Sequence, residues 1–162
     1  MIKFLESTYD TYTLFKEEGR ELSTYDNRCN FLNDLFKRKK VNQGEYLYLL
    51  HLDKENKLRD LELLKYSPGN YIKLDMKRDV IFKILNSTYP NIILTHNHPD
   101  QDSEPSYYDM DFTYKVKLLS DKLNKNLVDH LIWTDSEIFS FEQKNMIQAN
   151  TMDEIFENLL ST

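Results

Sequence analysis

Two histidines and a downstream aspartate form the pattern in this chain that is best suited to chemistry. His96 and His98 are one residue apart, and Asp109 follows after Ser106, which gives H-x-H-x7-S-x-x-D. At the end of a strand, residues i and i+2 point to the same side, so both imidazoles can reach one ion. Two imidazoles and one carboxylate leave a fourth position for water, which is the arrangement of a catalytic zinc. The pattern therefore predicts a zinc centre with His96, His98 and Asp109 as ligands.

The same residues allow other interpretations. Ser106 could be only the N-cap of a helix, with Asp109 in its first turn. Two histidines and a carboxylate could also hold Fe(II) for oxygen chemistry. Residues 96–100 resemble the beginning of the metallo-β-lactamase pattern, but Gln101 stands where that pattern has a further histidine. Zinc is preferred because the paired histidines and the S-x-x-D motif occur together.

A hydrolytic zinc centre also needs a general base beside the water, and Glu45 is the best candidate. Glu45 begins an apolar and aromatic run that ends at Leu52, bounded by a glycine and an aspartate. A charged residue beside such a run is unusual, although a solvated strand end would explain it. Glu55 and Glu62 compete for the role by composition only.

The elements that must position these residues follow from hydrophobic spacing. We expect helices within residues 1–40, over 75–85, from Ser106 onward and from Thr151 onward. We expect strands over residues 45–52, 57–66, 91–95, 127–133 and 138–141. The inner stripe of the helix after Ser106 is expected to be Phe112, Val116, Leu119 and Leu123. The strand over 91–95 leads directly into the histidines, and the following helix can fold Asp109 back beside them.

Composition narrows the class of protein. The 162 residues are 40% hydrophobic and 30% charged, with a net charge of −6, which is typical of a soluble globular domain and not of a nucleic-acid binder. Three glycines are too few for a Gly-rich phosphate loop. Cys29 is the only cysteine, so neither an internal disulfide nor a Cys-based zinc cluster is expected. No apolar run is long enough to span a membrane and no signal peptide is recognisable, so we expect a cytoplasmic protein.

Together these residues resemble the JAB/MPN (JAMM) zinc metalloprotease superfamily, and its RadC-like branch most closely. The superfamily pattern is an upstream glutamate and then H-x-H-x7-S-x-x-D, matched in order by Glu45, His96, His98, Ser106 and Asp109. The features of the RadC-like branch are the Glu-led strand at 45–53, HNHP at 96–99, Pro105-Ser106 and Asp-His-Leu-Ile at 129–132. The resemblance covers about residues 40–142.

The resemblance implies an α/β fold of the cytidine-deaminase-like kind, with a mixed β-sheet flanked by helices. It divides the chain into an N-terminal helical extension at 1–40, a RadC-like JAB/MPN domain at 41–145 and a C-terminal helix at 146–162. It implies Zn²⁺ on the three expected ligands, with Glu45 as general base and Ser106 helping to hold the oxyanion. The implied reaction is hydrolysis of a peptide or isopeptide bond.

Two further interpretations stay open, a metal-bearing binding module with little hydrolysis and a DNA-associated accessory protein. RadC-like proteins commonly carry Ser-Gly after the HNHP proline, whereas here residues 100–104 form an acidic loop that could disfavour an acidic substrate or supply an additional metal ligand. The longer relatives have a DNA-associated helix-hairpin-helix region, and residues 1–40 lack the Gly-rich hairpin of that motif. The basic run at 37–40 could contact nucleic acid or be a solvated helix end. We expect a peptide or protein-conjugate substrate, with nucleic acid and membrane disfavoured.

Four other residues invite a functional interpretation. His130 could orient a metal ligand or Asp129, or it could be a packed structural histidine. His51 alternates with apolar neighbours and is expected to be a satisfied residue of the sheet. Trp133 is expected in the core, and Cys29 is expected to be packed and inert.

Overall fold

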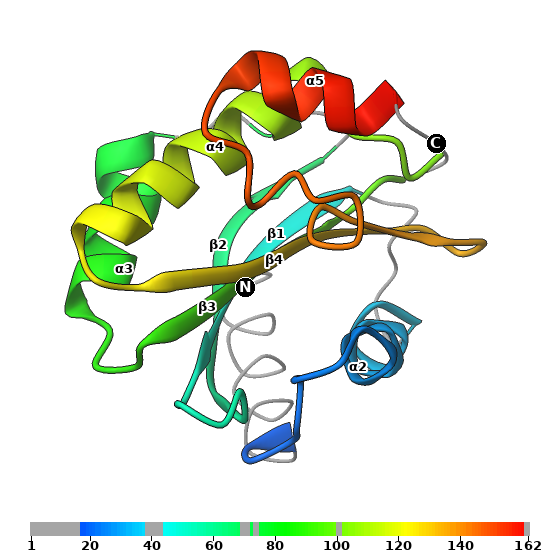
Figure 1. Ribbon diagram of the computed structural model, residues 1–162. Helices are drawn as coiled ribbons and strands as arrows, with labels where there is room; N and C mark the ends of the chain where they lie inside the picture. Colours follow the sequence, from blue (N-terminus) through cyan, green and yellow to red (C-terminus); the bar gives the residue numbers. More distant parts are fainter. Residues whose placement is uncertain (1–16, 38–43, 69–71, 73–74, 100–101, 161–162) are drawn as a thin grey trace.

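The computed structural model describes residues 17–37, 44–68, 72, 75–99 and 102–160 (Figure 1). Much of the expected N-terminal helical region, residues 38–40 of the basic run and residues 100–101 of the acidic loop lie outside the described residues.

A mixed five-stranded sheet forms the centre of the molecule, in the order β2-β1-β3-β4-β5. The strands are β1 (Glu45–Leu52), β2 (Leu58–Ser67), β3 (Asn91–Asn97), β4 (Asn126–Trp133) and β5 (Ile138–Ser140). β1 is antiparallel to both β2 and β3, and β5 is antiparallel to β4. β3 and β4 are parallel, so the chain must cross over between them, and it does so through a helix. The mixed sheet flanked by helices confirms the expected fold class.

Helices cover both faces of this sheet (Figure 1). One face carries α2 (Tyr25–Lys37), and the other carries α3 (Phe82–Asn86), α4 (Tyr107–Lys122) and α5 (Met152–Leu160). A π-helical segment, η2 (Met76–Ile81), leads into α3, whereas the sequence predicts one regular helix over 75–85. No helix among the described residues is both long enough and apolar enough to cross a membrane.

β1 is buried along its whole length because both of its faces are covered. Leu47 and Leu49 pack into the core beneath α3, α4 and α5, whereas Tyr48 and Leu50 pack into the core beneath α2. An uninterrupted apolar run is the sequence signature of a strand in that position. His51 lies on β1 and Trp133 at the end of β4, and both are buried. Trp133 lies in the core as expected, but Nδ1 of His51 has no partner in the described part of the chain, so the expectation of a fully satisfied histidine is wrong.

The end of β3 and the buried stripe of α4 differ from the sequence expectation, each for a physical reason. β3 continues to Asn97 because its pairing with β4 extends that far, to the partner residue Trp133. In α4 the fully buried residues are Met110, Thr113, Val116 and Ser120. Phe112, Leu119 and Leu123 are only partly buried against the same core. Small polar residues occupy two of the innermost positions. The buried face is therefore rotated around the helix relative to the stripe predicted from hydrophobicity alone.

A buried ion pair joins α2 to the sheet. The Nη1 atom of Arg28 donates to Oδ2 of Asp129 at 2.8 Å, and the Arg28 side chain also donates to two backbone carbonyls in the preceding turn. Asp129 is completely buried and also accepts from the Ser140 hydroxyl and the backbone N–H of Glu142. Burial raises the pKa of Asp129 to about 6, in spite of these donors. Arg28 therefore stabilises the negative charge of the Asp129 carboxylate, which would be unfavourable in an apolar core without a cation beside it.

Candidate metal centre

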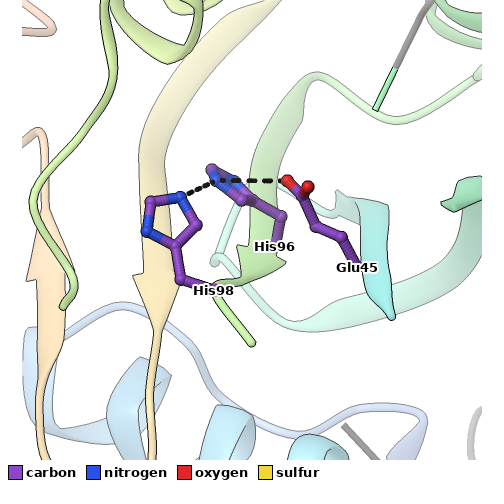
Figure 2. A group of neighbouring side chains, drawn as sticks. All are labelled: Glu45, His96 and His98. Carbon is purple, nitrogen blue, oxygen red and sulfur yellow. Dashed lines mark hydrogen bonds and ion pairs between the residues drawn. The ribbon is translucent and has the colours of Figure 1, made fainter. Parts of the chain in front are cut away.

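Side chains from three elements converge at the C-terminal end of β3. His96 is the next-to-last residue of β3, Glu45 is the first residue of β1, and Asp109 lies in the first turn of α4. The antiparallel register pairs Leu47 with His96, so Glu45, two residues earlier, is on the same face and diagonal to His96. Figure 2 shows Glu45, His96 and His98 facing one another. Residues distant in the sequence are thus brought together by strand register.

The polar atoms of this cluster lie within a few ångströms of one another. The two Nε2 atoms of His96 and His98 are 3.0 Å apart. The carboxylate of Asp109 lies 3.3 Å from Nε2 of His96 through Oδ1 and 3.7 Å from Nε2 of His98 through Oδ2. Oε1 of Glu45 is 3.8 Å from Nε2 of His96. Glu45, His96 and His98 are close enough to share one ion. Asp109 also approaches both histidines, so either carboxylate could complete a three-residue donor set.

Asn97 points to the other side of β3, as the strand spacing predicts, and it fixes the start of β1. Its side chain accepts from the backbone N–H of Tyr46 at 2.8 Å and donates to the carbonyl of Gly44 at 3.0 Å. Gly44 also lies very close to β2, because an added Cβ would be 2.4 Å from the carbonyl oxygen of Ser67. These contacts hold the backbone on both sides of Glu45 and so direct its side chain into the cluster.

Ser106 and Asp109 form a reciprocal cap at the N-terminus of α4. The backbone N–H and the hydroxyl of Ser106 donate to Oδ2 of Asp109 at 2.8 and 2.6 Å, and the hydroxyl accepts from the backbone N–H of Asp109. The capping interpretation is thus confirmed. The same carboxylate faces both histidines through its two oxygens, so capping does not exclude a role as ligand. The oxyanion role of Ser106 stays a prediction, and it requires the hydroxyl to rotate away from Asp109.

The pKa values in the cluster are those of a site that attracts positive charge. Burial works against ionisation of Asp109, but His96, His98 and Ser106 outweigh it and hold its pKa well below the usual range. Burial lowers the pKa of His98, but Asp109 and the backbone of Asp102 raise it more, so the net direction is upward. For Glu45, burial is the largest cause and Asp109 adds to it, so the pKa is raised despite the histidines. A carboxyl group with a raised pKa is suited to taking up and returning a proton.

The donor set fits a zinc ion. Nδ1 of His98 lies 2.8 Å from the backbone oxygen of Asp102, which can only accept, so in the neutral ring the proton is on Nδ1 and Nε2 presents its lone pair to the cluster. Tetrahedral ligands about 2.0–2.1 Å from zinc are roughly 3.3 Å from one another. The separations of 3.0 Å between the two Nε2 atoms and 3.3 Å between His96 and Asp109 are close to that value. Nitrogen and oxygen donors of this kind are the usual ligands of Zn²⁺.

A second group of potential ligands does not fit a metal as well. His51, Asp60 and Glu62 are close enough to share an ion, but Glu62 is already paired with Lys83 at 2.7 Å and with Nε2 of His51 at 3.1 Å. Nδ1 of His51 is buried without a partner among the described residues. A metal on Nε2 would leave a buried Nδ1–H without an acceptor, whereas metal-binding histidines normally donate that proton. We therefore prefer the cluster at the end of β3.

Two residues behind His96 complete the site, and only one of them is evident from the sequence. Nδ1 of His96 lies 2.9 Å from Nε2 of His130, and Nδ1 of His130 lies 2.6 Å from the hydroxyl of Thr113. Burial is the main cause that lowers the pKa of His130 well below that of a free histidine. Sequence reasoning considered His130 but missed Thr113, for which the available signal is its position one helical turn after Asp109.

The acidic loop does not contribute a carboxylate to the cluster among its described residues. The side chains of Asp102 and Glu104 are exposed, and Asp102 contacts His98 through its backbone oxygen. Ser103 is buried, and its backbone N–H lies 3.3 Å from a carboxylate oxygen of Glu137. The described part of the loop therefore orients His98 by its backbone.

The comparison with protein families agrees with this geometry. The family model of the RadC-like JAB domain matches residues 22–146, which is well over half of the chain and includes every residue of the cluster. The chain belongs to the RadC-like JAB domain family. The matched residues begin at 22 and therefore include α2, on the second face of the sheet, whereas the division of the chain at residue 40 stays a prediction.

Several relatives of this chain carry the name UPF0758 protein. The relative from Aquifex aeolicus (strain VF5) is 32% identical over 117 residues, which cover 72% of this chain and 48% of the relative. The relative from Pelodictyon phaeoclathratiforme is 33% identical over 103 residues, covering 64% of this chain and 46% of the relative. A Streptococcus thermophilus relative is 30% identical over 100 residues, covering 62% and 43%. The aligned part thus spans about half the length of these relatives.

Proposed function

We propose that this RadC-like JAB domain is a zinc-dependent hydrolase of peptide or isopeptide bonds. The observation that supports this proposal most strongly is the convergence of Glu45 on the set formed by His96, His98 and Asp109. His96, His98 and Asp109 would form the ligand set, and Glu45, whose pKa is raised, would remain available as a base. This is the combination that metal-assisted hydrolysis requires.

The residues have distinct roles in this proposal. His96, His98 and Asp109 would hold Zn²⁺. When bound in such a site, the ion would supply Lewis acidity, which lowers the pKa of a water molecule to about 7. Glu45 accepts the proton from the attacking water and returns it to the leaving nitrogen. The Ser106 hydroxyl turns from Asp109 and donates to the oxyanion of the tetrahedral intermediate.

The first test separates metal binding from hydrolysis. Zinc content is measured by mass spectrometry of purified protein, and cleavage is followed on a mixture of synthetic peptides and lysine isopeptides. We expect about one zinc per chain in the wild type and none in His96→Ala. Glu45→Gln should retain zinc and lose about 10²–10⁴-fold in cleavage rate, the usual contribution of a general base.

Glu62→Gln is the matched control for Glu45→Gln. Glu62 also neighbours a histidine, but it lies on β2 beside His51 and outside the proposed centre. Its replacement should leave both zinc content and cleavage unchanged. Equal cleavage by wild type and Glu45→Gln would show that Glu45 is not the base. Stoichiometric zinc without any cleavage would favour the binding-module interpretation, and wild type without zinc would exclude the metal centre.

A further inference from the structure

A buried hydrogen-bonded chain connects two of the expected metal ligands behind the site. It begins at Nδ1 of His96 on β3, passes through the ring of His130 on β4 and reaches the hydroxyl of Thr113 on α4. The hydroxyl is also 2.6 Å from the backbone oxygen of Asp109. The strand register makes this possible, because His130 pairs with Leu94 and therefore lies on the same face as His96.

The end of this chain determines the position of every proton along it. The backbone oxygen of Asp109 can only accept, so the single hydroxyl proton of Thr113 is donated there. The 2.6 Å contact between Thr113 and Nδ1 of His130 then requires the proton to be on Nδ1. Nε2 of the neutral His130 ring is consequently an acceptor, and Nδ1 of His96 must donate to it at 2.9 Å. The remaining nitrogen of His96, Nε2, is left with a free lone pair directed at His98 and Asp109.

The ring of His130 cannot readily adopt another orientation. It is completely buried and stacks on Phe141, with ring centroids 4.8 Å apart and an interplanar angle of 13°. Phe112 packs against it edge-on, with centroids 6.2 Å apart. Because packing fixes the ring plane, the two nitrogens of His130 can act only on His96 and Thr113.

We propose that His130 and Thr113 are positioning residues that hold His96 in the tautomer a metal requires. The inference depends on the proposed zinc centre but not on hydrolysis. Metal-binding histidines usually donate their second N–H to a carboxylate, a carbonyl or water, and here a neutral imidazole performs that function because Thr113 fixes its own tautomer. The hydrogen bonds also end at the backbone oxygen of Asp109. They therefore set the position of α4 relative to β3 at the point where both elements supply proposed ligands.

Removing the Thr113 hydroxyl should weaken metal binding indirectly, through the rings of His130 and His96. In Thr113→Val, Nδ1–H of His130 loses its acceptor, so the proton is better placed on Nε2. That proton then faces Nδ1 of His96 and favours His96 with its proton on Nε2, the atom a metal needs. We therefore expect Thr113→Val to bind Zn²⁺ about 10- to 100-fold more weakly, as measured by competition with a chromophoric chelator.

Two variants serve as controls. Thr113→Ser retains the hydroxyl that orients His130, so its affinity for Zn²⁺ should stay within about 2-fold of the wild type. Ser120→Ala removes another fully buried hydroxyl on α4 that has no hydrogen-bond partner in the described structure, and it should leave the affinity unchanged. The thermal midpoints of the metal-free variants are measured in parallel, so that a general loss of structure is distinguished from a loss of affinity.

The second measurement reports the tautomers directly. Long-range ¹H–¹⁵N spectra of the zinc-loaded wild type should place the proton of both His96 and His130 on Nδ1. His130→Phe fills the same space without an acceptor and should weaken Zn²⁺ binding at least as much as Thr113→Val. In the Co²⁺-loaded protein, the visible absorption of both variants should shift relative to the wild type.

The possible outcomes distinguish the positioning role from the zinc centre and from hydrolysis. Wild-type zinc affinity in both Thr113→Val and His130→Phe would overturn the positioning role while leaving the zinc centre intact. A proton on Nε2 of His130 in the loaded protein would overturn it independently. Wild type without zinc would overturn the positioning role and the proposed centre together. Zinc binding that weakens as expected, in a protein that cleaves nothing, would support the positioning role and contradict the hydrolase.

Discussion

Replacing Arg28 by methionine should destabilise the protein in a strongly pH-dependent way. Arg28 is the only cation within hydrogen-bonding distance of Asp129 in the described structure, and Asp129 is completely buried. Burial raises the pKa of Asp129 from 3.8 to about 6. At about 1.36 kcal/mol for each pKa unit, carrying this charge at pH 8 costs the folded state about 3 kcal/mol even with Arg28 present.

The sign of the pH effect follows from the direction of that change. Because the pKa is raised on folding, the stability that Asp129 contributes is complete below 3.8 and is lost as the pH rises through about 6. Without Arg28 the pKa rises further, so the additional loss falls at neutral and alkaline pH. We expect Arg28→Met to lose about 1–2 kcal/mol at pH 5, mainly from its hydrogen bonds, and about 3–5 kcal/mol at pH 8.

The assay is denaturant-induced unfolding of the metal-free protein at pH 5 and pH 8. Arg20→Met is the matched control, because Arg20 forms only partly buried ion pairs with Glu17 and Asp34, and its replacement should cost about 1 kcal/mol or less at both pH values. Adding Asp129→Asn to Arg28→Met should remove the excess loss at pH 8. An equal loss at both pH values, or a double variant as pH-sensitive as Arg28→Met, would refute the electrostatic explanation.

Three further predictions concern the backbone around the site. Asn97→Ala removes the side chain that bridges β3 to the start of β1, and unfolding experiments should show a loss of about 1–3 kcal/mol. Gly44→Ala places a methyl group 2.4 Å from the oxygen of Ser67, so unfolding should show a loss of about 1–3 kcal/mol and zinc-loaded protein should show slower cleavage, because Glu45 is displaced. Ser106→Ala should lose about 1 kcal/mol, whereas Ser106→Thr should keep the cap and most of the stability.

Local sequence signals were sufficient for β1 and for the start of α4, and they located β3 but not its extension through the proposed ligand His96 to Asn97. β1 has the predicted bounds because a glycine and an aspartate interrupt the apolar run at its two ends. α4 begins after Ser106 because the S-x-x-D spacing supplies both halves of a reciprocal cap. Alternation along β3 correctly places Asn97 on the face away from the cluster. Each of these features depends on residues close together in the chain.

Features that depend on strand register could not be predicted in the same way. The position of Glu45 beside His96 requires the pairing of Leu47 with His96, which no local signal specifies. The contact between His96 and His130 requires the parallel register of β3 and β4, including the irregularity after Ile92. The π-helical turn before α3 was also not expected, because its apolar spacing is compatible with a regular helix. Local patterns thus supplied candidate residues, and long-range pairing decided which of them meet.

Asp109 caps α4 with the same carboxylate that is proposed to bind the metal, and such a double use would have an evolutionary consequence. A descendant of this protein that no longer bound metal would still need an acceptor at position 109 to cap α4. The histidines are under no such second constraint from the helix. Loss of His96 or His98 should therefore mark a descendant that no longer binds metal, whereas the aspartate at position 109 should be retained because it caps α4.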